Sequence, residues 1–480
     1  MPAESFTKNR LAHWNGQAAA GRDPARGLRG FYRRLLSEQY RFLIPEGSRV
    51  MELGCAEGDL LASLKPASGV GVDFSARLLA EARERHPGLA FIEADAHDLS
   101  PAAAPEMLAE PFEAIILSDL VNDVWDAQTL FERLRPFCDQ NTRLFLNFHS
   151  HLWEHPFRLL ERAKLVTRRL EQNWLTPDDV KNILELSGFE VLRSFEAVLF
   201  PWGLPGLERL FNRWLVKIWP FSIFALTHFL VCRALPPPQK PGLVSVVVPA
   251  RNEAGNIENV ILRTPELGAG TELIFVEGHS TDDTWPAICA ALERHRDRRL
   301  KALQQPGRGK GDAVRAGFAL AEGDVLMILD ADLTVPPETL PKFFEALASN
   351  KGEFINGVRL VYPQEKKAMR FFNLVGNKFF SLAFSWLLGR PIKDTLCGTK
   401  VLSRANYLKI AANRAYFGDF DPFGDFDLLF GAAKLNLKIV DLPIRYQERT
   451  YGETNISRWR DGLILLRMVL FALNRIKFKP

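Results

Sequence analysis

The chain has 480 residues, more than a single hydrophobic core usually supports, so two or more domains are expected. Hydrophobic residues make up 47% and charged residues 25%, a balance that argues against extensive disorder. The formal net charge of +4 is small for this length and gives nucleic-acid binding no support, so we expect no nucleic-acid partner.

The sequence carries no sign of export or of a membrane span. Its first residues, MPAESFTKNRLAHWNGQ, lack the apolar core of a secretory signal, and no uncharged stretch is long enough to cross a bilayer. The five cysteines lack the paired spacing of a disulfide framework or a zinc site. These features predict a cytoplasmic protein and leave peripheral contact with the cytosolic face of a membrane open.

Clustered prolines divide the chain. The stretch ALPPPQKPG at residues 234–242 favours extended backbone and cannot continue a helix. On each side a β-rich apolar run, SRVMELG before it and LVSVVVP after it, opens a series of alternating strand and helix patterns. We therefore predict two α/β domains, residues 1–234 and 243–480, joined by a proline-rich linker at 235–242.

Glycines mark a ligand-binding turn in the first domain. A predicted strand at residues 49–53 is followed by the turn GCAEGD and by the start of a helix. Gly54 and Gly58 permit close approach of a ligand, and the amides and dipole of a helix N-terminus suit an electron-rich group. The next strand, residues 69–72, ends in Asp73, about twenty residues past the first turn, where nucleotide-binding α/β folds place a carboxylate against ribose hydroxyls.

Two further strands complete this pattern. The third, in AFIEADAHDL, ends at Asp95, and the fourth, AIILSDLVND, carries Ser118 and Asp119 at its carboxyl end. Open α/β sheets bind ligands at the carboxyl ends of their strands. Four consecutive strand ends are thereby predicted to face one crevice.

The motifs ELGCAEGDL, VGVDFS, FIEADAHDL and IILSDLV resemble, in this order, those of class I methyltransferases that use S-adenosylmethionine, over roughly residues 1–230. The later segment LTPDDVKNILELSGFEVLRSF resembles the closing helix and hairpin strands of that family. The resemblance implies a Rossmann-like fold and S-adenosylmethionine as the cofactor. It implies a cofactor-binding set of Glu52, Gly54 and Gly58 at the methionine pocket, Asp73 at the ribose and Asp95 near the adenine, with Ser118 at the same edge.

The activity of this domain stays open at the level of sequence. Ala56 stands where the turn commonly has its middle glycine, and its methyl group is tolerable unless the backbone there requires a positive φ. The alternative to an active methyltransferase is a non-catalytic domain that binds the cofactor or docks a partner. Methyl transfer needs mainly alignment of a nucleophile, so the methyl acceptor leaves little trace in a sequence.

Two other segments of this domain admit two interpretations each. His149, His151 and His155 in NFHSHLWEH suit a catalytic base or metal ligands, but an ordinary polar loop is favoured. Residues 206–231 mix aromatic and aliphatic residues with basic ones, as membrane-surface helices do. Because Pro220 interrupts the segment and the domain needs a closing element, a helical hairpin packed on the domain is favoured.

Two carboxylates dominate the second domain. In DVLMILDADLTVPPE, an apolar strand delivers Asp330 and Asp332 at its exit, where alternate residues of an extended strand face the same side. Such a pair suits Mg²⁺ or Mn²⁺ bridging a diphosphate, because the ion neutralises charge that grows on a departing nucleotide. The alternative for the tripeptide alone is a solvated turn.

SVVVPARNE, FVEGHSTDDT, GRGKGDAVRAG, ILDADLT and RTYGETN resemble, in this order, the inverting glycosyltransferases of family two with the GT-A fold, over about residues 242–460. The resemblance implies a nucleotide-sugar donor and a nucleotide-sugar-binding set of Pro249, Glu253, Glu277, Lys310 and Asp312. Glu277 stands where the family usually has aspartate, so the nucleobase stays open. Arg449 matches a late family motif and is a candidate for diphosphate stabilisation, since its guanidinium binds two oxygens at once.

The segment GDFDL resembles a family motif whose first aspartate deprotonates an acceptor hydroxyl, which makes Asp425 the candidate base. Helix capping is the alternative role for these acidic residues. A phosphate acceptor is already ionised and needs no base.

The acceptor is suggested by the segment from Met369 to Arg404, which resembles the interfacial region of dolichyl-phosphate and polyprenyl-phosphate sugar transferases. Its apolar, aromatic helix with flanking basic residues fits a membrane surface, as does LILLRMVLFALNRIKFKP at the C-terminus. Asp394 lies at a family motif near the acceptor. These features predict a lipid-linked acceptor and a bifunctional enzyme of surface-glycan or glycolipid synthesis. A sugar transferase acting on a glycan or soluble hydroxyl, with a non-catalytic first domain, is the alternative.

Overall fold

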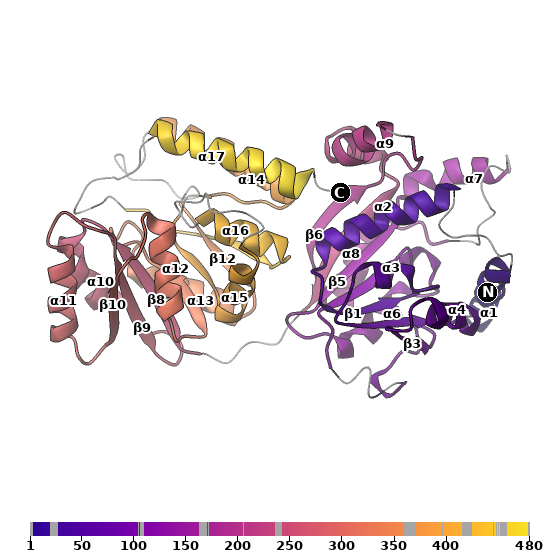
Figure 1. Ribbon diagram of the computed structural model, residues 1–480, viewed down its shortest axis with the longest axis horizontal. Helices are drawn as coiled ribbons and strands as arrows, with labels where there is room; N and C mark the ends of the chain where they lie inside the picture. The colour runs from indigo at the N-terminus through magenta and orange to yellow at the C-terminus, as the bar shows by residue number, and fades with distance from the viewer. Residues whose placement is uncertain are drawn as a thin grey trace. The chain divides into compact units, whose positions relative to one another are not determined.

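Figure 1 shows the computed structural model, which describes residues 3–19, 27–103, 105, 110–162, 170, 172–204, 206–235, 242–359, 371–395, 397–414, 425–444, 446–447, 449, 451 and 458–478. The chain forms two compact units, Met1–Pro236 with Phe478–Pro480, and Pro237–Lys477. Each unit holds one seven-stranded sheet. Most of the predicted linker at 235–242 lies outside the described residues.

The sheet of the first unit has the strand order β3-β2-β1-β4-β5-β7-β6. Its first five strands in this order are parallel, whereas β7 pairs antiparallel with both β5 and β6. The bounds are β1 (Arg49–Leu53), β2 (Ser68–Asp73), β3 (Ala90–Glu93), β4 (Ala114–Ser118), β5 (Arg143–His149), β6 (Phe189–Ala197) and β7 (Thr227–Ala234). From β1 the chain adds β2 and β3 on one side, and it then returns to add β4 and β5 on the other side. The carboxyl ends of β1 and β4, where this order reverses, border the crevice in which such sheets bind ligands.

Helices cover both faces of this sheet, since successive strand residues point to opposite sides. Met51 and Leu53 pack on one face with α6 and α8, while Val50 packs on the other with α2, α3 and α7 (Figure 1). The bounds are α1 (Ala3–Ala19), α2 (Gly27–Leu43), α3 (Asp59–Ser63), α4 (Ala76–Arg85), α6 (Ala127–Leu134), α7 (Glu154–Arg162) and α8 (Pro177–Leu186). The predicted closing helix and strand are therefore α8 and β6.

The structure differs from the predicted helical hairpin at residues 206–231. Residues 207–224 do form short helical turns, starting with α9 (Leu207–Arg209), but Thr227–Ala234 is strand β7. This strand lies between β5 and β6, and nearly all of its residues are buried. A strand buried on both faces lacks polar alternation, so its sequence cannot be told from a buried helix by periodicity.

The sheet of the second unit has the order β10-β9-β8-β11-β13-β12-β14. β10, β9, β8 and β11 are parallel, β13 is antiparallel to both β11 and β12, and β12 is parallel to β14. The bounds are β8 (Val244–Ala250), β9 (Thr271–Glu277), β10 (Arg299–Gln304), β11 (Val325–Ile328), β12 (Phe354–Val358), β13 (Lys400–Ser403) and β14 (Ile439–Pro443). The strands that carry the predicted donor-site motifs are thus adjacent, and their carboxyl ends share one edge.

Two helical layers enclose this second sheet (Figure 1). Val247 and Ile274 pack with α12, α14, α15, α16 and α17, and their neighbours Val246 and Leu273 pack with α10, α11 and α13. The bounds are α10 (Ile257–Arg263), α11 (Thr284–Arg294), α12 (Lys310–Leu320), α13 (Leu340–Ala348), α14 (Phe371–Leu388), α15 (Arg404–Ala412), α16 (Asp425–Lys434) and α17 (Arg458–Ala472). Within the described ranges, no helix combines the length and apolarity needed to cross a bilayer.

Candidate functional sites

The glycine turn of the first unit is tied to the end of β2. Asp73, the last residue of β2, accepts hydrogen bonds from the amides of Ala56 (3.0 Å) and Ser75 (2.9 Å). Burial raises the pKa of Asp73, although the two amides oppose this effect. A carboxylate offers about four acceptor positions, so Asp73 can fix the turn and still accept hydrogen bonds from ribose hydroxyls.

The backbone of the turn is left-handed at three positions. The φ angles of Gly54, Ala56 and Gly58 are 70°, 47° and 74°. The left-handed conformation costs a residue with a Cβ atom about 1 kcal/mol, because Cβ approaches the following carbonyl oxygen. The replacement of the middle glycine by Ala56 therefore introduces strain, but the turn keeps its shape.

Glu52, within β1, presents an unsatisfied carboxylate oxygen beside this turn. Its side chain is 3% exposed, and its Oε2 atom has no hydrogen-bond partner among the described residues. Burial raises the pKa of Glu52 to about 8. A buried oxygen of this kind suits a ligand group that carries a positive charge or donates hydrogen bonds, as the methionine ammonium of S-adenosylmethionine does.

The other two predicted cofactor residues lie at the same sheet edge. Asp95 follows β3 by two residues and accepts a hydrogen bond from the His97 amide, with the His97 Nδ1 also at 2.9 Å. The hydrogen bond from the His97 side chain lowers the pKa of Asp95. Ser118 is the last residue of β4 and is half-buried. Their contacts with a cofactor remain predictions.

A polar network lies at the ends of β4 and β5, and it was not predicted from the sequence. The Asp119 Oδ1 atom accepts hydrogen bonds from Tyr32 Oη (3.0 Å) and Asn147 Nδ2 (2.6 Å), and His149 Nδ1 lies 3.5 Å from it. Asp119 itself has a left-handed backbone, with φ 54°. Strained backbone held by several hydrogen bonds is common at functional sites. We therefore add this network to the candidate site.

His149 has a different environment from the histidines that follow it. It is the last residue of β5 and is 8% exposed, whereas the side chains of His151 and His155 are exposed. The polar-loop interpretation thus describes His151 and His155 but not His149. The sequence signal for His149 was its place as the polar residue at the end of the mostly apolar run LFLNFH. Tyr32 comes from α2, far away in the sequence, and carried no local signal.

In the second unit each carboxylate of the predicted metal pair has its own cation. Lys310 Nζ lies 2.5 Å from Asp330 Oδ1, and Arg449 Nη2 lies 2.7 Å from Asp332 Oδ2. Burial opposes ionisation of Asp330, but the charges of Lys310, Arg359 and Lys400 outweigh it, so the pKa of Asp330 lies below its usual value. Asp330 is thus held ionised at the exit of β11.

Arg449 connects the carboxylate pair to the end of β8. Its Nη1 atom lies 3.1 Å from Glu253 Oε1 while its Nη2 atom contacts Asp332. Burial raises the pKa of Glu253 to about 7, although Asn256 and Arg449 oppose this effect. Residues of the same late motif, Gly452, Thr454 and Asn455, lie outside the described residues.

Lys310 and Asp312 lie in the first turn of α12. Asp312 accepts a hydrogen bond from the Gly307 amide (2.8 Å) and so closes the glycine-rich loop that precedes the helix. Gly398 packs against the Lys310–Asp330 pair, since a Cβ atom at this position would overlap both side chains. Gly398 lies in DTLCGTK, the motif that begins with Asp394, but the sequence did not single it out.

The remaining donor-site residues are placed by β8 and β9. Pro249 lies near the end of β8 and is half-buried. Glu277, the last residue of β9, is 2% exposed and accepts a hydrogen bond from the Ser280 amide (2.5 Å). Burial would raise the pKa of Glu277, but the hydrogen bonds from Ser280 outweigh it and lower the pKa. Glu277 therefore shapes the turn after β9, and its contact with a nucleotide remains a prediction.

Asp394 is buried rather than presented to an open site. It is 1% exposed and pairs with Arg359 through two hydrogen bonds, Nε to Oδ2 (2.8 Å) and Nη2 to Oδ1 (2.9 Å). The proximity of Asp394 to the acceptor stays a prediction. In this arrangement Arg359, which the sequence did not single out, is the group that Asp394 orients.

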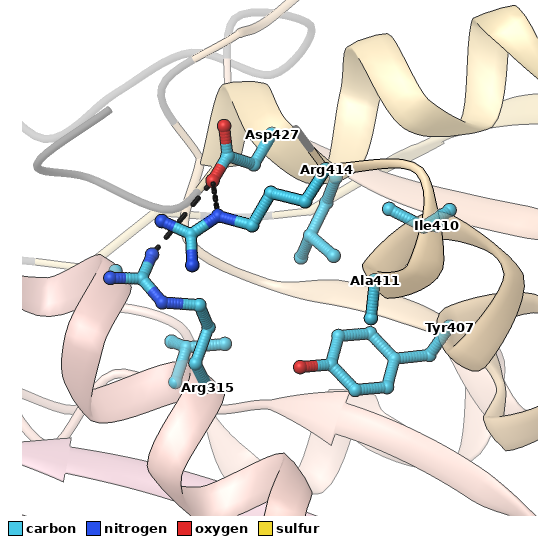
Figure 2. Close-up of a pocket in the computed structure, with 9 residues that line it drawn as sticks. Arg315, Tyr407, Ile410, Ala411, Arg414 and Asp427 are labelled. Atoms are coloured by element: carbon cyan, nitrogen blue, oxygen red, sulfur yellow. Dashed lines mark hydrogen bonds and ion pairs between the residues drawn. The ribbon is translucent and has the colours of Figure 1, made fainter. Parts of the chain in front are cut away.

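Asp425 is the first residue of α16, but its side chain lies outside the described residues. Its neighbour Asp427 lies 3.1 Å from Arg414 Nε and 3.8 Å from Arg315 Nη1. Figure 2 shows both guanidinium groups directed at this carboxylate. They border a cavity of about 170 Å³ lined by Gly311, Val314, Arg315, Tyr407, Ile410, Ala411, Arg414, Asp427 and Leu428. Asp427 thus joins α16 to α12 and α15.

The donor set at β11 fits a hard divalent cation. Within the described part of the chain, no group of three or more His, Cys, Asp and Glu residues could hold a metal. Mg²⁺ and Mn²⁺ sites in nucleotide-using enzymes commonly combine one or two carboxylates with phosphate oxygens and water. Asp330 and Asp332 would supply the two carboxylates of such a site.

Comparison with known proteins follows the same division. Residues 245–406 match the family model of glycosyl transferase family 2, and residues 25–194 match that of a methyltransferase domain. The undecaprenyl-phosphate 4-deoxy-4-formamido-L-arabinose transferase of Pseudomonas aeruginosa is 35% identical over 222 residues, which cover 45% of this chain and 61% of that protein. The dolichol-phosphate mannosyltransferase of Pyrococcus furiosus is 28% identical over 219 residues, which cover 45% of this chain and 59% of that protein.

A solved structure is also similar to about half of the chain. Glucosyl-3-phosphoglycerate synthase from Mycobacterium tuberculosis, in complex with Mn²⁺, uridine diphosphate and glucosyl-3-phosphoglycerate, shares 21% identity at a TM-score of 0.35, covering 49% of this chain and 80% of that chain. The chain spans less than two thirds of the length of the two curated relatives. The family matches and the two sheets confirm the predicted fold class. The chain combines a methyltransferase domain of Rossmann-like fold with a glycosyl transferase family 2 domain of GT-A fold.

Proposed function

We propose that the chain is a bifunctional enzyme of surface-glycan or glycolipid synthesis on the cytosolic face of a membrane. The second domain, residues 243–480, transfers a sugar with inversion from a nucleotide-sugar to a polyprenyl-phosphate-type acceptor. The first domain, residues 1–234, methylates that product or a related intermediate. The observation that carries the sugar-transfer proposal is the pair Asp330 and Asp332, each with a cationic partner, at the exit of a buried strand.

The residues around this pair suit a nucleoside diphosphate leaving group. Asp330 and Asp332 would hold Mg²⁺ or Mn²⁺, which neutralises the growing charge on the departing diphosphate. Lys310 and Arg449 lie against the same two carboxylates and are therefore within reach of anionic oxygens bound there. Gly398 keeps the Lys310–Asp330 pair free of a neighbouring side chain.

Two observations support a lipid-linked phosphate as the acceptor. The similar proteins above are named for transfer to undecaprenyl phosphate and dolichol phosphate. The paired helices α14 and α17 also expose large apolar side chains to solvent, including Phe379, Leu382, Leu463 and Leu470. Such side chains on adjacent helices with basic neighbours suit the surface of a bilayer.

The alternative is a hydroxyl acceptor with Asp425 as the base. Replacing Asp425 with Asn distinguishes the two chemistries, because a phosphate acceptor needs no proton removal and a hydroxyl does. Near-normal turnover of D425N with polyprenyl phosphate supports the phosphate acceptor. A loss of about a hundredfold or more identifies Asp425 as an obligatory base. D427N serves as a control for effects on α16, since Asp427 binds Arg414 and Arg315.

Three features support S-adenosylmethionine binding in the first domain. Glu52 offers an unsatisfied buried oxygen, Asp73 holds the turn with acceptor capacity left, and the turn has its left-handed glycines. When bound, the cofactor supplies an electrophilic methyl group. The chain's own contribution is to orient the acceptor, and His149 beside Asp119 is the candidate to accept a hydroxyl proton.

The experiment that tests the proposal supplies the full-length chain with a panel of nucleotide-sugars, extracted polyprenyl phosphates and labelled S-adenosylmethionine, with and without Mn²⁺. Release of nucleoside diphosphate that needs both metal and lipid supports the sugar transfer. Label in the lipid product supports the methylation. Cofactor binding by calorimetry, without methyl transfer to any lipid-linked sugar, would favour a non-catalytic first domain.

A further inference from the structure

The connection between strands β6 and β7 of the methyltransferase domain is unusually long. Strands β6 and β7 are antiparallel neighbours, and two to five residues are enough to connect such a pair. Here the chain runs from Val198 to Leu226 before β7 begins. Connections this long within a compact domain usually have a function of their own.

This connection gathers exposed apolar side chains. Those of Trp202, Leu204, Leu207, Leu210, Trp214, Ile218, Trp219, Phe221, Ile223 and Phe224 are all between 39% and 78% exposed. Single exposed apolar residues are ordinary, but a contiguous cluster marks a surface that binds something apolar. We call residues 202–224 the apolar projection.

The helical part of the apolar projection carries a stripe of exposed apolar side chains. Leu207, Leu210 and Trp214 are exposed along the run, which changes from α-helix to π-helix at Leu210, and Ile218 is exposed where the run ends. Trp214 also stacks on Phe478 of the same unit, at 4.2 Å between ring centroids, yet remains 40% exposed. Among the residues that the structure describes, little covers the stripe.

The opposite side of the helical run is anchored to the domain. Asn212 Oδ1 accepts hydrogen bonds from the amides of Leu199 (2.9 Å) and Phe200 (2.7 Å), and Val216 is 1% exposed. Farther along, Trp153 Nε1 donates to the Phe224 carbonyl (3.1 Å). The exposed stripe is thus held in a defined orientation and is not a loose segment that could fold back on itself.

Basic residues run beside this stripe. Arg209, Arg213 and Lys217 recur every four residues, and the one acidic residue of residues 198–226, Glu208, lies 3.4 Å from Arg34 of α2. Aromatic and aliphatic side chains flanked by Arg and Lys are the composition of helices that lie in the plane of a bilayer. The basic side chains then meet anionic head groups while the apolar ones enter the acyl boundary.

We propose that the apolar projection docks the methyltransferase domain on an anionic lipid surface. The same face would suit a second copy of the chain less well, because a symmetric interface would bring the two basic stripes against each other. The inference goes beyond the proposed reactions, since it concerns a surface of the first domain and holds whether or not that domain is catalytically active.

The test uses the full-length chain with vesicles of phosphatidylcholine alone and of phosphatidylcholine mixed with phosphatidylglycerol. Flotation on the anionic vesicles should weaken at high salt. Trp219→Glu places a charge at the most exposed side chain of the projection, at 78%, and should lower the affinity of the chain for the anionic vesicles about tenfold, while α14 and α17 retain the remaining affinity. Leu186→Glu, at a side chain that is 63% exposed on α8 of the same unit, is the matched control and should bind as the unaltered chain does.

Two further measurements separate docking from misfolding and from self-association. Hydrogen exchange of the unaltered chain should slow within residues 207–224 when anionic vesicles are added, and Arg209→Ala should weaken vesicle binding about fivefold. Equal vesicle affinity of the unaltered chain and Trp219→Glu over a titration of anionic lipid, or no protection of residues 207–224, would overturn the proposal. So would a change from dimer to monomer in Trp219→Glu by light scattering without any effect on vesicle binding, because the projection would then cover a second copy.

Discussion

Glu52 links the stability of the first domain to pH in a way that can be measured without any ligand. Its carboxyl group is 3% exposed, and burial raises its pKa from 4.5 to about 8. A carboxyl group whose pKa is raised on folding stabilises the folded state fully at pH values below its unfolded pKa. That contribution is lost as pH rises toward the folded pKa, so the domain weakens between about pH 4.5 and about pH 8.

The size of the effect follows from the two pKa values. Each factor of ten in proton affinity is worth about 1.4 kcal/mol, so the difference between 4.5 and about 8 corresponds to about 5 kcal/mol above pH 8. Glu52→Gln keeps the shape of the side chain but cannot ionise. Relative to the unaltered chain, the variant should gain about 1.4 kcal/mol for each pH step of one within this window.

Hydrogen exchange of the peptide covering β1 provides the assay. At each pH the exchange rate of the unaltered chain is divided by that of Glu52→Gln. This division cancels the intrinsic dependence of amide exchange on pH and leaves the ratio of the opening constants of the two proteins. Between about pH 5.5 and about pH 7.5 this ratio should change about a hundredfold in favour of Glu52→Gln. An unchanged ratio would refute the view that burial, rather than a structural partner, controls the protonation of Glu52. The same variant should bind S-adenosylmethionine more weakly by calorimetry.

Three other substitutions test individual features of the two sites. Ala56→Gly should stabilise the first domain against urea by about 1 kcal/mol, because it removes a Cβ atom at φ 47°. Ala62→Gly, inside α3, is the control and should destabilise the domain by a similar amount. Equal effects of the two substitutions on stability would contradict the proposed strain at Ala56. Gly398→Ala should lower the rate of sugar transfer about a hundredfold by displacing Lys310 and Asp330, while S-adenosylmethionine binding stays unchanged. Arg449→Lys should reduce kcat for sugar transfer at least tenfold, since an ammonium cannot contact Asp332 and Glu253 together with the geometry of a guanidinium; normal kcat would remove Arg449 from the site.

The features that sequence could predict are those written in local patterns. The ends of β1, β2 and β11 could be predicted because each apolar run is followed by a glycine turn or by acidic residues. Strand ends and turns depend on residues that are neighbours in the sequence. The strand at Thr227–Ala234 escaped prediction, since burial on both faces removed the alternation that identifies a strand. A run without polar alternation fits a helix equally well by pattern.

The features that escaped prediction depend on contacts between distant parts of the chain. Tyr32 reaches Asp119 from a helix that precedes the glycine turn, and Arg449 reaches Glu253 across most of the second domain. Gly398 contacts the Lys310–Asp330 pair from a loop far along the chain. Neither periodicity nor spacing encodes such pairings, so only the fold brings them together.

We propose that Asp330 and Asp332 together hold the divalent ion used in sugar transfer. The direct measurement is Mn²⁺ binding by electron paramagnetic resonance, in the presence of nucleoside diphosphate, to the unaltered chain, Asp330→Asn and Asp332→Asn. We predict one tightly bound Mn²⁺ for the unaltered chain, and for each variant at least a tenfold loss of Mn²⁺ affinity with a matching loss of sugar transfer. Unchanged Mn²⁺ affinity in both variants would contradict the claim and place the ion, if the reaction needs one, elsewhere in the chain.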